Sequence, residues 1–243
     1  MFPLAHHPDG PRQSTTHISA LQRPKTFPEF QTMFDHIYGE KNRKDYPSGS
    51  DLVLRLMEEG SIIMELARKD TRKDFRRQLA RGFSWYVALA NRAKVDLNEA
   101  LWFKYPGVCP YCMKTESCVC GLEQPKVEGK EEMLRRLRKE RASMPKTLED
   151  NRVFHAILYG PQNKRIMPIQ TAAHLVEEMG EVSRELRHRK RQDFCNEMAD
   201  VGSWFFALAT RLEFVPFDDL VWEAFPYECD MCHQEMCACE GVI

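Results

Sequence analysis

The 243-residue sequence has no long hydrophobic run and almost no net charge. No apolar stretch reaches the roughly 18 residues that a membrane-spanning helix needs, so we expect no membrane partner. A formal net charge of −1 gives no overall field that would attract nucleic acid or an acidic membrane. The first residues, MFPLAHHPDGPRQSTTH, lack the basic and then apolar segments of a secretory signal. We therefore expect a cytoplasmic protein.

Nine cysteines are present, and eight of them form two clusters with nearly the same spacing, C-x₂-C followed by C-x-C. Two close pairs of cysteines suit tetrahedral zinc, and cytosolic thiols stay reduced, so we predict one structural Zn²⁺ per cluster. Disulfides are disfavoured by the compartment, whereas an iron–sulfur cluster remains an alternative. The flanking residues are not basic, so we expect no nucleic-acid partner. The predicted ligands are Cys109, Cys112, Cys118 and Cys120 in the first cluster and Cys229, Cys232, Cys237 and Cys239 in the second.

The chain contains an internal repeat with a period of roughly 120 residues. The segment PKT recurs with the same spacing to a Y-G pair and nearly the same spacing to an S-W pair, to the segment ALA and to a cysteine cluster. We therefore predict an all-α protein in which each repeat has three long helices, a short fourth helix and a terminal cysteine cluster. The predicted parts are a mobile tail (1–23), a first repeat (24–120), a charged linker (121–144) and a second repeat (145–243).

The first helix of each repeat carries clear local signals. The patterns T-x-x-E at 26–29 and T-x-x-D at 147–150 resemble capping boxes that open a helix. Gly39 and Gly160 are predicted to end these helices, because glycine readily adopts the left-handed conformation of a helix terminus. The predicted apolar stripes are Phe30, Met33, Phe34 and Ile37 in the first repeat and Val153, Ile157 and Leu158 in the second.

The second repeat contains two pairs of acids at helical spacing. Glu178 and Glu181 lie three residues apart, as do Glu197 and Asp200. Residues three apart share one face of a helix, so two neighbouring helices would direct these carboxylates to one place. Like charges at such a place require a cation, and a site made only of oxygen ligands suits Mg²⁺ or Mn²⁺. The alternative is that the acids are simply the solvated faces of helices.

The first repeat retains the apolar frame but loses most of these acids. Glu59 corresponds to Glu178, whereas the three other positions hold Ile62, Gln78 and Arg81. Acids that served only solubility would have equal reason to occur in both repeats. We therefore predict a single carboxylate site, carried by the second repeat.

The acidic pattern resembles the signature of the MazG-type all-α nucleoside triphosphate pyrophosphohydrolases, whose relatives include dimeric dUTPases and phosphoribosyl-ATP pyrophosphohydrolases. In that family an E-E-x-x-E helix, a short basic loop and an E-x-x-D helix follow one another, and residues 177–181 and 197–200 match in full. The resemblance covers most of residues 145–225 and, in degenerate form, 24–105, but not the cysteine clusters. It implies two MazG-like helical bundles packed as a pseudo-dimer.

The resemblance also implies an activity, namely hydrolysis of a nucleoside triphosphate to a monophosphate and pyrophosphate in the second repeat. The implied catalytic residues are Glu177, Glu178, Glu181, Glu197 and Asp200. All of them except Glu177 would hold the Mg²⁺ or Mn²⁺ ion, and any of the five could accept the proton of the attacking water. A non-catalytic nucleotide sensor or a zinc-knuckle interaction protein is the alternative.

A triphosphate substrate also needs cations. Arg81 of the first repeat is a further candidate, because it stands where the second repeat has Asp200 and could reach across between the repeats. Trp204 could stack on a base, although core packing is the better explanation because Trp85 occupies the same place in the first repeat. Association of whole chains into homo-oligomers is compatible with this architecture. The substrate-binding candidates are Lys164, Arg165, Lys190, Arg191 and Trp204.

Overall fold

The computed structural model describes residues 22–69, 72–120, 125–212 and 215–240, and these residues contain helices but no strand. The predicted all-α class is therefore confirmed. None of the described helices is both long and apolar enough to cross a membrane. Most of the predicted mobile tail lies outside the described residues.

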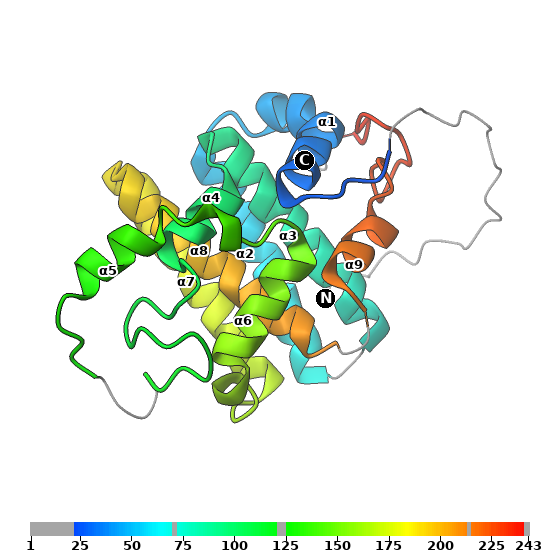
Figure 1. Cartoon of the computed structure of the whole chain (residues 1–243). Helices are drawn as coiled ribbons and strands as arrows, with labels where there is room; N and C mark the ends of the chain where they lie inside the picture. The colour runs from blue at the N-terminus through cyan, green and yellow to red at the C-terminus, as the bar shows by residue number, and fades with distance from the viewer. Residues whose placement is uncertain (1–21, 70–71, 121–124, 213–214, 241–243) are drawn as a thin grey trace.

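Each repeat supplies three long helices and one short helix (Figure 1). The linker between the repeats contains α5 (Lys130–Leu137) and the 3-10 helix η1 (Arg141–Ser143). The first repeat forms α1 (Phe27–Asp45), α2 (Gly49–Lys69), α3 (Arg72–Ala93) and α4 (Leu97–Lys104). The second repeat forms α6 (Leu148–Asn163), α7 (Pro168–His188), α8 (Arg191–Thr210) and α9 (Phe217–Ala224).

Both predicted capping boxes form, but the two glycines do not end their helices. Thr26 and Thr147 each accept a hydrogen bond from the backbone N–H three residues later, and the acidic side chain there accepts one in return. Gly39 and Gly160 keep a negative φ, and the helices continue to Asp45 and Asn163. In α1 the turn after Gly39 contacts the second cysteine cluster, because Lys41 donates a hydrogen bond to the backbone oxygen of Cys239.

The predicted apolar stripe of α1 is buried as expected, whereas the stripe predicted for α6 is partly wrong. In α6, Val153 and Ile157 are 40% and 52% exposed. The buried face instead includes the polar residues Asn151 and His155. Partners offset part of their lost hydration: the Asn151 amide donates to the Asn98 side chain at 3.0 Å, and His155 Nδ1 lies 2.8 Å from the Asn151 backbone oxygen.

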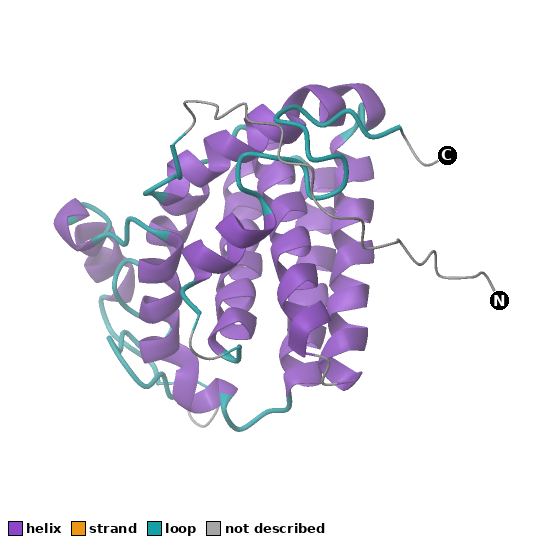
Figure 2. Cartoon of the chain, turned by 90° about the vertical axis from the view of Figure 1, so that its right-hand side faces the viewer, coloured by secondary structure: helices purple, strands orange, loops and turns teal. Residues whose placement is uncertain are grey.

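The helices of the two repeats pack against each other in reciprocal pairs. The second helices α2 and α7 are in contact, as are the third helices α3 and α8. The short α4 packs on α8 of the other repeat, and α9 packs on α3 (Figure 1). Figure 2 shows the long helices lying side by side in one bundle. Each repeat's short helix therefore covers the third helix of the other repeat.

A shared aromatic core joins the repeats. The ring of Phe83 in α3 lies 5.9 Å from Phe27 in the same repeat, and 5.7 Å and 5.0 Å from Phe205 and Phe217 in the other. Phe27, Phe83, Phe205 and Phe217 are all fully buried. Because a buried Phe contributes about 1.5–3 kcal/mol through the hydrophobic effect, this core ties the two repeats into one folding unit.

The cysteine clusters also cross between the repeats. The first knuckle (residues 109–120) docks on α6, where the backbone N–H of Cys118 donates to the oxygen of Leu158 at 2.8 Å. The second knuckle (residues 229–239) docks on α1, where Cys237 donates to Ile37, also at 2.8 Å. Each knuckle is therefore attached to the first helix of the repeat to which it does not belong.

Candidate active site and metal centres

The sulfur positions of both knuckles fit a tetrahedral metal ion. In each knuckle the four Sγ atoms lie within 4.8 Å of one another, and all nine cysteines are free thiols. The Sγ–Sγ distances from Cys118 to Cys109 and Cys112 are 3.5 Å and 3.7 Å. A tetrahedral ion with Zn–S bonds of about 2.3 Å places its sulfurs about 3.8 Å apart, whereas a disulfide needs about 2.05 Å. Both clusters could therefore hold Zn²⁺.

The thiols of each knuckle also have the electrostatic character of metal ligands. Although burial disfavours its thiolate, hydrogen bonds from backbone N–H groups lower the pKa of Cys112 to about 7, and the same holds for Cys232. Burial raises the pKa of Cys118 and Cys239 to about 11, helped by neighbouring thiols. Without a cation such clusters stay largely protonated, and a bound dication lets more of their thiols ionise.

The candidate carboxylate site lies between α7 and α8. One carboxylate oxygen from each of Glu178, Glu197 and Asp200 lies within 4.8 Å of the others. Glu181 is outside this group, because its 38% exposed side chain pairs with Arg184 at 3.2 Å. Glu177 is 66% exposed and pairs with a histidine of its own helix. The structure thus brings together three of the five predicted acids.

The carboxylates of this site are crowded and partly desolvated. Burial raises the pKa of Glu178 to about 7; nearby Asp200, Glu181 and Glu197 add to the rise, while a hydrogen bond from Trp204 opposes it. Burial also raises the pKa of Glu197 to about 7, with Asp200 raising it further and Lys104 opposing the rise. Both glutamates are therefore about half protonated near pH 7, and a cation entering the site would favour their ionised forms.

Two residues of the first repeat contact Asp200. The ammonium group of Lys104 and the hydroxyl of Tyr105 each donate a hydrogen bond to the Asp200 carboxylate. Lys104 and Asp200 are only 13% and 12% exposed, so their ion pair is mostly desolvated. One lysine neutralises one of the three carboxylates. The two that remain match the charge of a divalent cation.

Lys104 and Tyr105 were not among the predicted site residues, although a signal for them exists. The corresponding residues of the second repeat are Ala224 and Phe225, which lack the charge and the hydroxyl. The polar pair therefore occurs only in the copy that faces the acids. This difference between the two copies becomes informative once α4 is known to pack on α8 of the other repeat.

In the first repeat, the residues that correspond to the carboxylate site form other contacts. The amide of Gln78 donates a hydrogen bond to the buried carboxylate of Glu59, where the second repeat has two acids. Arg81, which was expected to reach across to the carboxylates, instead pairs with Asp230 of the second knuckle at 3.3 Å. No group of metal-ligating side chains occurs here among the described residues.

The predicted substrate-binding cations are not gathered around the carboxylates. Lys164 and Arg165 are exposed at the C-terminal end of α6. Lys190 is also exposed and lies 3.6 Å from Asp193. All three side chains are accessible to a ligand, but only Lys164 lines the cavity described below.

The two remaining candidates, Arg191 and Trp204, already have contacts within the protein. The guanidinium of Arg191 donates to the backbone oxygens of Ala93 and Lys94, both at 2.7 Å, and so ties α8 to the end of α3. The Trp204 ring stacks on His174 with centroids 4.7 Å apart. Because Trp204 also donates a hydrogen bond to Glu178, it lies beside the carboxylate site.

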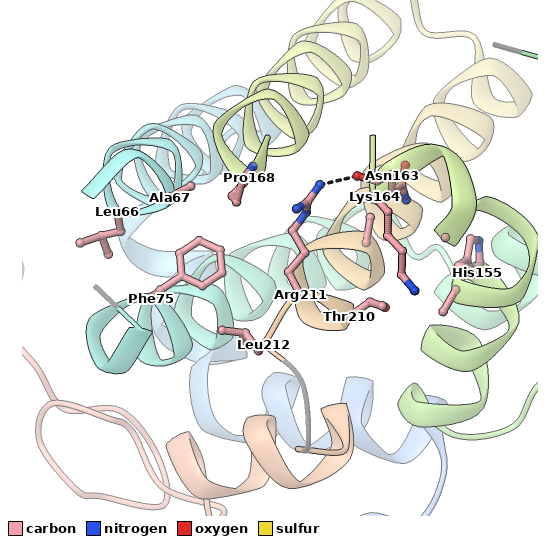
Figure 3. A pocket seen from close by; sticks show the side chains of 13 residues that line it. Leu66, Ala67, Phe75, His155, Asn163, Lys164, Pro168, Thr210, Arg211 and Leu212 are labelled. Carbon is pink, nitrogen blue, oxygen red and sulfur yellow. Dashed lines mark hydrogen bonds between the residues drawn. The ribbon is translucent and has the colours of Figure 1, made fainter. Parts of the chain in front are cut away.

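A cavity of about 250 Å³ lies further along α8 and is lined by both polar and apolar side chains (Figure 3). Arg211 donates to the backbone oxygens of Ile166, at 2.6 Å, and of Asn163, but its buried Nε has no partner among the described residues. Buried Nε2 of His155 likewise has none. Burial lowers the pKa of His155 to about 4, so its ring is neutral, and Nδ1 faces a backbone oxygen. Nε2 is therefore an acceptor.

No protein-family model, curated protein or solved structure matches the chain. The interpretation of the carboxylate site therefore depends on its own geometry and chemistry. Its features are three converging carboxylates, a lysine and a tyrosine from the other repeat, and a cavity about two helical turns further along α8.

Proposed function

We propose that the protein is a Mg²⁺-dependent nucleoside triphosphate pyrophosphohydrolase with one active site, on the second repeat. The observation that carries this proposal is the convergence of Glu178, Glu197 and Asp200 on one point, with two glutamate pKa values near 7. Carboxylate oxygens without histidine or cysteine suit a hard cation. The likeness of this region to the MazG-type signature supports the same assignment.

Within this proposal each side chain has a distinct role. Glu178, Glu197 and Asp200 hold Mg²⁺ or Mn²⁺, which when bound neutralises charge on phosphate oxygens and lowers the pKa of a water. Glu181 stays outside the ligand group but is near enough to raise the pKa of both glutamates, so it is the candidate to accept the proton of the water. Lys104, beside Asp200, is the candidate to pair with a phosphate oxygen.

The cavity further along α8 is the proposed seat of the nucleoside. Its lining includes the polar residues Asn163, Lys164 and Arg211 beside apolar ones, a mixture that suits a base and its sugar. Ala207, which lines the cavity, follows Asp200 by seven residues on α8, a separation of about 10 Å along the helix axis because a helix rises about 1.5 Å per residue.

We also propose that the repeats form a MazG-like pseudo-dimer stabilised by two structural zinc ions. The reciprocal packing of α4 on α8 and of α9 on α3 supports this arrangement. In it the first repeat is not a second enzyme. It contributes Lys104 and Tyr105 to the active site of the second repeat.

A panel of ribonucleoside, deoxyribonucleoside and damaged nucleoside triphosphates with Mg²⁺ tests the proposed activity. We expect at least one of them to yield pyrophosphate and a monophosphate, and no product without a divalent cation. Release of orthophosphate instead would contradict the proposal. Mg²⁺-dependent nucleotide binding without turnover would favour a nucleotide sensor, an alternative supported by the contacts that Asp200 already makes with Lys104 and Tyr105.

A further inference from the structure

The first knuckle lies beside the carboxylate site, although it belongs to the other repeat. Tyr105, whose hydroxyl donates to Asp200, precedes Cys109 by only four residues. Tyr105 is buried, with 6% of the residue exposed, and its ring packs against the rings of His155 and Tyr159 in α6, at centroid distances of 5.1 Å and 6.0 Å. The position of Tyr105 therefore depends on how this segment is held against α6.

The knuckle is held on α6 through a backbone oxygen that a proline leaves free. Pro161 lies inside α6 and has no N–H, so the oxygen of Ile157 loses its usual donor four residues later. The backbone N–H of Ser117 in the first knuckle takes that place at 3.1 Å. The Ser117 N–H thus satisfies a backbone acceptor that the helix itself leaves without a donor.

The cysteines and α6 also share a small buried cluster. Cys109, Cys112 and Cys118 pack with Leu158, which is fully buried, and the ring of Tyr159 packs against the same group. Contacts thus run without a gap from the cysteines through Tyr159 to Tyr105 and on to Asp200.

The second knuckle has the same attachment but a different neighbour. Cys237 donates to Ile37 of α1 as Cys118 donates to Leu158 of α6, with the same 2.8 Å distance. The residue that corresponds to Tyr105 is Phe225, which has no hydroxyl. The second knuckle is therefore a built-in control, because it has the same ligands and the same docking mode but, among the described residues, no cluster of converging carboxylates beside it.

We propose that the first knuckle is a positioning element of the carboxylate site. A zinc ion held by Cys109, Cys112, Cys118 and Cys120 keeps the preceding segment on α6, and Tyr105 is the positioning residue that orients Asp200. Occupancy of the first knuckle by zinc then sets the affinity of the carboxylates for their own divalent cation. The inference rests on the proposed function only in taking these carboxylates as a cation site.

Mn²⁺ binding by the full chain, followed from the electron paramagnetic resonance signal of free Mn²⁺, tests this proposal. Cys120→Ser and Cys239→Ser alter the last ligand of the first and second knuckle, and each variant should retain about one zinc ion by elemental analysis. We expect Cys120→Ser to weaken Mn²⁺ binding about tenfold or more, which is the loss typical of disturbing a group that hydrogen-bonds to a metal ligand. Cys239→Ser should leave binding within about twofold. Equal Mn²⁺ affinities in the two variants would overturn the proposal.

A second pair of variants keeps the test decisive if a cysteine variant does not fold. Tyr105→Phe removes only the hydroxyl that reaches Asp200, whereas Tyr38→Phe removes the hydroxyl beside Asp230 of the second knuckle. Both should retain two zinc ions, and only Tyr105→Phe should weaken Mn²⁺ binding, by about tenfold. Unchanged binding in Tyr105→Phe would also overturn the proposal.

The outcome for the wild-type protein separates this inference from the proposed function. Mn²⁺ binding that depends on Tyr105, without turnover of any nucleotide, would leave the inference standing and refute the hydrolase. Nucleotide turnover, together with Mn²⁺ binding that is unchanged in the first-knuckle variants, would support the hydrolase and refute the inference. A wild-type protein that binds no Mn²⁺ would refute both.

Discussion

Replacing Glu197 with glutamine should stabilise the protein at pH 8 without added Mg²⁺, even though it removes a proposed metal ligand. Burial and the adjacent Asp200 raise the pKa of Glu197 to about 7, so its charged form is disfavoured in the folded state. The first repeat already has an uncharged side chain at the equivalent position, where Gln78 donates a hydrogen bond to Glu59.

The size and pH range of this effect follow from the shift in pKa. A rise from 4.5 to about 7 corresponds to about 3 kcal/mol, because one pKa unit is about 1.4 kcal/mol. Solvent screening of the partly exposed carboxylate reduces the expected gain to about 1–2 kcal/mol. The folded protein binds this proton more tightly than the unfolded chain, so the penalty is full above pH 7 and disappears as the pH falls toward 4.5.

Thermal unfolding of the wild type and Glu197→Gln at pH 8 and pH 5 tests the prediction. At pH 8 the midpoint should rise by about 2–8 °C in the variant, since 1 kcal/mol shifts a chain of this size by about 2–4 °C. At pH 5 the gain should be much smaller, and Mg²⁺ should stabilise only the wild type. Glu177→Gln is the control, because that acid lies on α7 outside the carboxylate group. A loss of stability at pH 8, or an equal gain at both pH values, would refute the reasoning.

Three further predictions concern the site and the helix that carries it. Mn²⁺ affinity should fall about 10- to 100-fold from pH 8 to pH 6, because protons on one or both glutamates with pKa values of about 7 compete with the ion, and calorimetry should detect proton release on binding. Lys104→Met should strengthen Mn²⁺ binding, because it removes a positive charge that repels a cation beside Asp200. The same variant should raise the KM for the triphosphate, because it loses the charge that would attract a phosphate. Binding assays should thus show a gain in affinity for Mn²⁺ and kinetic assays a loss for the substrate. Gly202→Ala should destabilise the fold by about 1–3 kcal/mol in urea unfolding, because its Cβ would lie 2.7 Å from the Tyr86 hydroxyl. Gly180→Ala, with no neighbour within 4 Å of the added Cβ, should not destabilise it.

Each of these predictions has a contradicting result. A Mn²⁺ affinity that does not change with pH would show that the glutamates are not its ligands. Weaker Mn²⁺ binding in the Lys104 variant would show that the lysine supports the cation rather than competing with it. Equal stability of the two glycine variants would show that the contact between Tyr86 and α8 is not tight.

Local signals in the sequence predicted much of the fold and both cysteine clusters. The capping boxes at Thr26 and Thr147 need only residues within one helical turn, and so they could be recognised directly. Cysteine spacing within a dozen residues likewise indicates a metal site without knowledge of the fold. The i, i+3 spacing correctly placed Glu197 and Asp200 together because they share one helix face, whereas the same rule wrongly added Glu181 to Glu178.

The features that could not be predicted depend on distant contacts. Lys104 reaches Asp200 across 96 residues of sequence, and the intervening packing of α4 on α8 has no local signal. Gly39 looks like a helix terminus, but the second knuckle binds the following turn of α1 through Lys41. Arg191 looks like a phosphate ligand in a basic segment, yet backbone oxygens of the first repeat occupy its guanidinium.

The most direct test of the central claim is the rate of Mg²⁺-dependent pyrophosphate release in two matched variants. Glu178→Gln alters the proposed metal site, and Glu59→Gln makes the same change at the equivalent position of the first repeat. We predict that Glu178→Gln loses at least about 100-fold in rate, the scale typical of removing a catalytic group, while Glu59→Gln stays within a few-fold of the wild type. Equal rates in the two variants would contradict a single active site on the second repeat.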